Sequence, residues 1–292
     1  MSNFNIGLLG FSGRVGSALI GPLLEAHRDG KINLIILHRV TSDLSKIPFE
    51  VAVEKRVVEL IEAGMEGLIN AVEVLDVLIS TISGPGFTSQ KYLVDALASS
   101  KRLKTFIPSD FGVSWTEEES SNPVLPFIKL KTQVVHRALE LGIPVTNVRL
   151  PLFDELVLGY GKLGMDVKKN KVEVYRNSLI NPLRITTLPY LAYALTQLIQ
   201  SPSLIANRTI TLYDHSPTGK EIIDVLTKIH GYPTEVTEYT EERYEADLGE
   251  MRAAIGAAAW KRWGDGVWGE EEKVEVDGWH GESFEELVRK YI

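Results

Sequence analysis

The sequence predicts an α/β protein built on a doubly wound parallel sheet, followed by a smaller α+β region. Over about the first 150 residues, short apolar runs alternate with amphipathic segments of helical length, the pattern of strands joined by crossover helices. The run Asn33–Leu37 is apolar almost throughout, which is typical of a parallel strand buried on both faces. The alternation stops after Pro151. We therefore expect one domain over residues 1–153 and a second region over residues 154–292, some of whose segments return to the first sheet.

Six strands and four helices are expected in the first domain. The first helix has Val15, Leu19 and Leu23 on one face, and Pro22 should kink or break it. The expected strands are Asn5–Leu9, Asn33–Leu37, Lys55–Leu60, Val74–Ile82, Thr105–Ile107 and Val145–Leu150. The expected helices are Arg14–Arg28, Glu62–Ala71, Ser89–Ala98 and Phe127–Leu141, and the last ends at Gly142-Ile143-Pro144.

Local signals beyond these elements are weaker. The run Glu117–Glu119 is expected to lie on a solvated surface. Thr218 should cap a helix, with Glu221 completing a capping box. Tryptophans gather near the end of the chain, where they are expected to pack in a core. The second region should contain strands Lys171–Tyr175 and Thr209–Leu212 and helices Leu188–Gln200, Thr218–His230 and Phe284–Tyr291.

Composition excludes several classes of function. The chain has 292 residues, a net charge of −8, six histidines and no cysteine. The acidic balance disfavours a nucleic-acid partner. The absence of cysteine excludes disulfides and thiolate metal sites, and no two histidines have a metal-ligand spacing, so no metal is expected. We see neither an export leader nor an apolar run of about 18 residues, so we expect a cytoplasmic protein with no membrane partner.

A glycine-rich turn follows the first strand. Gly10, Gly13 and Gly16 are spaced G-x-x-G-x-x-G, and a helix follows. In this setting the glycines permit a sharp turn, the close approach of a pyrophosphate, and close packing of the helix on the strand. The free N–H groups and the helix dipole would then hold the anion. The alternative is that the glycines only allow the strand and the helix to pack closely and that the turn binds no anion.

Arg39 follows the second strand, where a bound dinucleotide presents its adenosine ribose. An acidic residue at this point binds a free 2′-hydroxyl, whereas arginine accommodates a 2′-phosphate. No Asp or Glu occupies positions 36–41, and Ser42 and Lys46 are near enough to add contacts. This pattern favours NADP(H) over NAD(H). The alternative is a solvated loop arginine.

Further polar residues end strands at the same sheet edge. Ser80 ends the fourth strand, and Ser109 lies in the loop Pro108–Gly112 after the fifth. Cofactors bind beyond the carboxyl ends of such strands, so both are candidate cofactor contacts. Gln90 opens the next helix and is another candidate, although a surface position fits it equally well.

The chemistry points to a lysine. Hydride transfer requires a group that donates or accepts the accompanying proton, and a lysine serves when its pKa falls through desolvation or a nearby cation. No tyrosine in the sequence is followed by lysine four residues later, so the usual short-chain dehydrogenase pair is missing. Lys129 and Lys131 lie on the expected helix, two residues apart, so at most one faces the cofactor. The alternative is that both are solvated.

Three blocks together resemble a known family. They are Gly10-Phe11-Ser12-Gly13-Arg14-Val15-Gly16, Phe106-Ile107-Pro108-Ser109-Asp110-Phe111-Gly112, and Lys131 placed eleven residues before Gly142. They are similar to the NmrA-like group of atypical short-chain dehydrogenases, which includes the isoflavone, pinoresinol–lariciresinol and phenylcoumaran benzylic ether reductases. Ser283–Leu287 resembles the closing helix of that family.

The resemblance implies a Rossmann fold that binds NADP(H) in residues 1–153 and a mostly substrate-binding region in residues 154–292. It implies that Lys131 is the catalytic lysine, that Arg39 holds the 2′-phosphate, and that Phe153 packs near the nicotinamide. The residues that would cradle the pyrophosphate are Gly10, Ser12, Gly13, Arg14 and Val15. Two departures are notable, because Asp110 replaces the commoner glutamate and Pro151 stands where the plant enzymes often have asparagine. The second puts the substrate and the stereochemistry in doubt.

These observations lead to a functional hypothesis. We expect an NADPH-dependent reductase of a small, apolar aromatic or conjugated metabolite, with Lys131 as general acid or base and with Phe111 and Phe153 lining the substrate pocket. The protein would be a monomer or a homodimer. The alternative is an NADP(H)-sensing regulator that turns over no substrate and acts through a protein partner. The missing tyrosine disfavours a third reading, an enzyme acting on nucleotide sugars.

Overall fold

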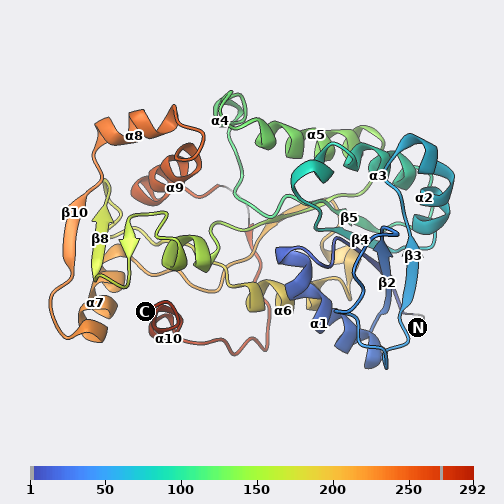
Figure 1. Ribbon diagram of the computed structural model, residues 1–292, viewed down its shortest axis with the longest axis horizontal. Helices are drawn as coiled ribbons and strands as arrows, with labels where there is room; N and C mark the ends of the chain where they lie inside the picture. Colours follow the sequence, from blue (N-terminus) through green and yellow to red (C-terminus); the bar gives the residue numbers. More distant parts are fainter. Residues whose placement is uncertain (1–2, 270–271) are drawn as a thin grey trace.

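The computed structural model describes residues 3–269 and 272–292, and its central feature is a parallel sheet (Figure 1). Five strands lie in the order β3-β2-β1-β4-β5, and every pair is parallel. They are β1 (Asn5–Leu9), β2 (Asn33–His38), β3 (Glu54–Val57), β4 (Val77–Ser80) and β5 (Thr105–Ile107). The strand order reverses beside β1, so the sheet is doubly wound and the predicted fold class is confirmed.

The sheet continues beyond β5 through segments from both halves of the chain. A bridge between Phe106 and Val145 brings in β6 (Thr146–Arg149), which pairs in parallel with β9 (Arg208–Thr211), and β9 pairs with β11 (Glu272–Lys273). Residues after position 153 therefore contribute strands to this edge of the sheet.

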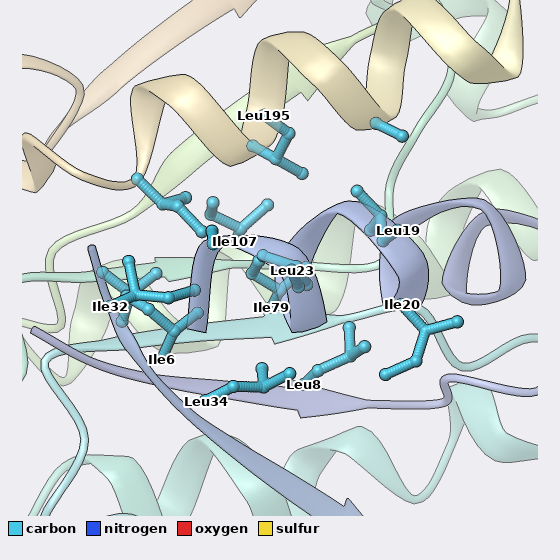
Figure 2. Close-up of a cluster of buried hydrophobic side chains, with 14 of the residues drawn as sticks. Ile6, Leu8, Leu19, Ile20, Leu23, Ile32, Leu34, Ile79, Ile107 and Leu195 are labelled. Atoms are coloured by element: carbon cyan, nitrogen blue, oxygen red, sulfur yellow. The ribbon is translucent and has the colours of Figure 1, made fainter. Parts of the chain in front are cut away.

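Helices cover both faces of the sheet. The helices α1 (Arg14–Arg28) and α6 (Leu188–Leu198) pack on one face, and α2 (Met65–Val72), α3 (Gln90–Leu97) and α5 (Pro126–Glu140) pack on the other (Figure 1). Figure 2 shows the first of these layers, where Leu19 and Leu23 of α1 and Leu195 of α6 meet Ile79 and Ile107 of the sheet. Helix α1 continues from Arg14 to Arg28 with Pro22 inside it, so the break that the sequence allowed at Pro22 does not occur.

The remaining part of the chain forms a second lobe. A small sheet has the order β10-β8-β7, with α7, α8, α9 and α10 around it (Figure 1). These elements are β7 (Met165–Asp166), β8 (Lys171–Val174), β10 (Glu235–Glu238), α7 (Gly219–His230), α8 (Glu241–Leu248), α9 (Ala254–Asp265) and α10 (Phe284–Arg289). The predicted capping box of Thr218 and Glu221 is present. Short helical turns complete the described elements: η1 (Glu62–Gly64), η2 (Gly84–Phe87), α4 (Glu117–Ser120), η3 (Glu155–Gly159) and η4 (Pro202–Leu204).

An aromatic cluster forms the core of this lobe. Trp260 stacks on Tyr239 and on Trp263, with ring centroids 5.0 and 5.3 Å apart. Tyr175 meets Tyr239 edge to face at 5.3 Å. The tryptophans at 260, 263 and 268 are buried, which confirms the packing role predicted for them. No helix within residues 3–269 and 272–292 has both the length and the apolar character needed to cross a bilayer.

An ion pair joins the two lobes and corrects one prediction. Glu119 of α4 is not solvated, because both its oxygens accept hydrogen bonds from Arg262 of α9, at 2.7 and 2.6 Å. Arg262 also donates to the carbonyl of Ser114 and lies over the ring of Trp115. Its side chain is only 9% exposed. A charge buried to this degree is costly without its partner, so the pair holds α4 against α9.

This pair makes stability depend on pH. Burial is the largest single influence and raises the pKa of Glu119, but the bonds and charge of Arg262 and the hydrogen bonds with Thr116 together lower it to below the usual glutamate value. The resulting stabilisation is complete above the unfolded-state pKa of about 4.3 and is lost as pH falls below it. We expect Glu119→Gln to cost about 3 kcal/mol at pH 7, because Arg262 is left buried and unpaired, and to flatten the acid limb of the stability curve. Denaturant unfolding at a series of pH values measures both effects.

The control for this prediction is Glu118→Gln, a neighbouring exposed glutamate in the same first turn of α4. It removes the same charge without touching Arg262. Equal losses of stability in the two variants would show that the Glu119–Arg262 pair does not stabilise the fold.

Candidate functional site

A cavity of about 630 Å³ opens at the carboxyl edge of the sheet, beside the point where the strand order reverses. Its walls come from the glycine-rich turn after β1, the end of β2 and the segments that follow β3 and β4. Ligands bind at this place in doubly wound sheets. The residues that line it include Gly10, Phe11, Ser12, Gly13, Arg39, Ser42, Thr81 and Ile82.

The three glycines of the turn have different reasons to be glycine. Gly10 has φ +91°, and a Cβ atom there would lie 2.8 Å from Thr81 Oγ1. A Cβ atom at Gly16 would lie 2.7 Å from Phe11 Cα and closer still to the carbonyl oxygen of Gly10. At Gly13, in contrast, it would meet its nearest protein atom at an ordinary 3.4 Å. Packing within the protein therefore accounts for Gly10 and Gly16 but not for Gly13, whose missing side chain leaves room for a ligand.

The first turn of α1 presents unused donors. Gly13 occupies the cap position and has no side chain with which to cap, and the first intrahelical bond reaches back from the Ser17 N–H to the Gly13 carbonyl at 2.7 Å. The N–H groups of Arg14, Val15 and Gly16 precede that bond. No acidic side chain occupies this first turn. The helix end therefore has the donors and the dipole that favour an anion.

Arg14 does not point freely into this space. Its guanidinium lies 2.7 Å from Glu155 Oε2 and 4.5 Å from the centre of the Phe153 ring. Glu155 begins η3, a single turn of π-helix, and the preceding Asp154 accepts a hydrogen bond from the Tyr291 hydroxyl at 2.6 Å. An anion at the glycine-rich turn would compete with Glu155 for the guanidinium.

The basic residues after β2 lie at two places. Arg39 is exposed at the wall of the cavity, and its backbone N–H donates to Ser42 Oγ at 3.1 Å. Lys46 lies against the glycine-rich turn, where its Nζ donates to Ser17 Oγ at 2.8 Å. Arg39 therefore lines the cavity, whereas Lys46 contacts the start of α1 and is not among the lining residues.

Ser80, Gln90 and Ser109, the candidate cofactor contacts at the strand ends, form hydrogen bonds within the protein. Ser80 and Gln90 are both buried, and the serine hydroxyl donates to Gln90 Oε1 at 3.1 Å. Ser109 is also buried and donates to the carbonyl of Ile82 at 2.5 Å. A surface position for Gln90 is therefore wrong, and none of the three side chains lines the cavity. They brace the strand ends beneath it.

The lysine on α5 faces a carboxylate. Lys131 Nζ lies 3.5 Å from Asp110 Oδ1, and its side chain is only 18% exposed. The other oxygen of Asp110 accepts a hydrogen bond from Arg149 Nη1 at 2.5 Å. The ring of Phe87 lies 5.7 Å from the same Lys131 nitrogen. The sequence missed Arg149 and Phe87 as members of this cluster, and no local spacing marks either one.

Phe111 and Phe153 are partly buried and pack against the hydrophobic core on the α1 side of the sheet. Phe153 contacts Arg14, so it lies by the glycine-rich turn. Phe111 directly follows Asp110. Their roles in substrate binding remain predictions. Within the residues that the structure describes, no group of three or more His, Cys, Asp or Glu side chains is arranged to hold a metal ion.

Comparison with known proteins gives consistent matches. The sequence profile of the NmrA-like family matches residues 3–291. Bifunctional pinoresinol-lariciresinol reductase 1 of Linum usitatissimum is 25% identical over 260 residues, which cover 84% of this chain and 81% of that protein. Isoeugenol synthase 1 of Clarkia breweri is 32% identical over 109 residues, and that match spans only 35% of this chain and 33% of the relative.

Solved structures share the fold over the whole chain. Isoflavone reductase superimposes with a TM-score of 0.79 at 16% identity, and the match covers 99% of this chain and 100% of that one. AtPrR2 with NADP⁺ and (+)pinoresinol gives 0.76 at 17% identity, with full coverage of both chains. At such low identity these likenesses show the fold.

The packing of the glycine-rich turn can be tested with two substitutions in one helix. We expect Gly16→Ala to destabilise the protein by about 3 kcal/mol, because the added methyl group meets the backbone of residues 10 and 11. Gly21→Ala is the matched control, since nothing lies within 4 Å of its Cβ position, and it should stabilise α1 by about 0.5–1 kcal/mol. Thermal and denaturant unfolding measure both changes. A tolerated Gly16→Ala would contradict the close approach of α1 to the β1 turn.

Proposed function

The chain belongs to the NmrA-like family, and from that premise we propose that it is an NADPH-dependent reductase of a small, largely apolar aromatic or conjugated metabolite. The observation that carries the proposal is Lys131, a largely buried lysine that α5 brings to the carboxyl edge of the sheet beside Asp110. A reductase needs a proton donor at this edge, whereas a protein that only binds the dinucleotide does not.

The cavity supports a dinucleotide cofactor. Gly13 leaves room that the protein's own packing does not require, and the uncapped start of α1 offers N–H donors to a pyrophosphate. Arg39, exposed at the cavity wall, is the proposed partner of a 2′-phosphate. Among the structural neighbours, AtPrR2 was solved with NADP⁺ and the leucoanthocyanidin reductase of Vitis vinifera with NADPH. NADPH, when bound, would supply the hydride.

The substrate class follows from the surroundings of Lys131. Phe87 lies 5.7 Å from the ammonium, and Phe111 directly follows Asp110, so two aromatic residues come from segments next to this charged cluster. Such surroundings suit an aromatic or conjugated molecule with few polar groups. A reductase of pinoresinol and lariciresinol among the relatives supports the same class. In this proposal Lys131 gives a proton to the substrate atom that becomes anionic after reduction.

We expect Lys131→Ala to abolish turnover and leave the affinity for NADPH nearly unchanged, because the lysine acts on the proton and not on the phosphates. Proton-transfer groups contribute about 10²–10⁴-fold to a rate. The assay follows NADPH oxidation with a panel of enones, quinones and aryl ethers. Lys129→Ala, on the same helix, is the control and should keep full activity.

Two outcomes would count against this assignment. Full activity of Lys131→Ala would remove the lysine from the mechanism. Cofactor binding by the unaltered protein with no turnover of any panel member, together with a partner captured only in the presence of the cofactor, would favour an NADP(H)-sensing regulator.

Arg39 should set the preference between the two dinucleotides. We expect Arg39→Ala to weaken NADPH binding by about 10–100-fold, the loss of charge-assisted hydrogen bonds, with little effect on NADH. Lys46→Ala is the informative contrast, since Lys46 contacts the glycine-rich turn and its loss should weaken both dinucleotides to a similar extent. Calorimetric titrations of each variant with each dinucleotide measure these changes. Equal losses for NADPH and NADH in Arg39→Ala would refute the assignment of a 2′-phosphate site.

A further inference from the structure

One carboxylate at the sheet edge is shared by two cations. Asp110 lies in the loop after β5, Arg149 ends β6, and Lys131 lies on α5, so three separate elements bring the cluster together. All three side chains are largely buried, with exposed fractions of 8% for Asp110, 16% for Arg149 and 18% for Lys131. A single carboxylate cannot neutralise two cations, so this cluster keeps a net positive charge.

The two cations do not share the carboxylate equally. Arg149 Nη1 donates to Oδ2 at 2.5 Å, whereas Lys131 Nζ stands 3.5 Å from Oδ1. Oδ1 is buried and accepts no hydrogen bond in the structure. The arginine therefore forms the close pair, and the lysine is left with a loose electrostatic contact.

Backbone pairing holds Asp110 close to Arg149 but does not connect it to Lys131. Gly112 and Arg149 form a parallel bridge, and the Leu150 N–H donates to the Gly112 carbonyl at 3.1 Å. Arg149 in turn lies opposite Thr211 in the pairing of β6 with β9. The loop that bears Asp110 and the strand that bears Arg149 are thus joined to each other. Lys131 approaches from a helix that shares no backbone pairing with them.

We propose that Arg149 is a positioning residue for the reaction: it occupies Asp110 and so keeps the Lys131 ammonium free to give up its proton. This inference rests on the proposed function. In the step it serves, an N–H bond of the ammonium breaks, the proton passes to the anionic atom that hydride addition leaves on the substrate, and water returns a proton to the neutral amine. Without the arginine, Asp110 closes on Lys131 and holds the ammonium in a tight ion pair.

Lysine labelling tests this without any substrate. The protein is treated briefly with acetic anhydride, and the modification of Lys131 relative to Lys129 is measured by peptide mass spectrometry. Lys129 is the internal reference because it lies on the same helix. We expect Arg149→Met to lower the ratio several-fold, since a lysine nitrogen held in a tight ion pair is less accessible to the reagent. Arg149→Lys should preserve the ratio, because it keeps a cation against Asp110.

The decisive variant combines two changes. Asp110→Asn in the Arg149→Met background removes the carboxylate that would capture Lys131, so the ratio should return at least to that of the unaltered protein. A purely structural role for Arg149 predicts instead that the second substitution leaves the ratio low or lowers it further. Thermal melting checks that each variant folds, and Arg149→Gln replaces Arg149→Met if the latter does not. An unchanged ratio in the folded single variant would overturn the proposal.

Turnover gives a second readout once a panel substrate is found. We expect Arg149→Met to lower kcat about tenfold or more with an unchanged KM for NADPH, and Asp110→Asn to restore part of the loss. A loss confined to KM would overturn the positioning role. If no panel compound is reduced, the proposed function fails, whereas the labelling result still decides how Arg149 acts on Lys131.

Discussion

Helix α1 begins so close to the end of strand β1 that position 16 has no space for a side chain, and much of the site depends on this contact. It places the first turn of α1 over the carboxyl edge of the sheet, directly after Ser12 and Gly13, which line the cavity. It also sets the depth at which Leu19 and Leu23 meet the sheet. At Gly13, by contrast, a Cβ atom would meet no protein atom closer than 3.4 Å, so a ligand has room to approach the backbone there.

The sequence predicted the elements wherever a local pattern determines them. Apolar runs located the strands, and the capping residues Thr218 and Glu221 located the start of α7, because these signals lie within a few residues of each other. Strand ends were less accurate, as with β3, which spans Glu54–Val57 and not Lys55–Leu60. The prediction for Glu119 was wrong because its partner Arg262 lies 143 residues away in the sequence. Without knowledge of that partner, a glutamate in an acidic run is expected to be solvated.

In the candidate site too, local signals were found from the sequence and contacts between distant residues were not. The glycine-rich turn and Arg39 are apparent from spacing and from position relative to strands, whereas only the resemblance to a family distinguishes Lys131 from Lys129. Asp110 was noted only as a departure from a motif, and Arg149 escaped notice, because a contact between residues 39 apart leaves no periodic trace. Ser80 and Gln90 as cofactor contacts stay a prediction, and the sequence pattern did not reveal that both side chains are buried and bonded to each other.

The pairing of Arg14 with Glu155 has a consequence for how anions enter the turn. With the guanidinium already matched to a carboxylate, an arriving phosphate exchanges one anion for another and adds no ion pair at that arginine. Its net electrostatic gain there is small, and the affinity should depend on ionic strength less steeply than the number of nearby cations suggests. Small free anions gain little binding free energy from such an exchange. A ligand that also fills the rest of the cavity gains additional contacts there. If the turn binds the cofactor as proposed, Glu155 would make it favour a ligand that fills the rest of the cavity over a small free anion.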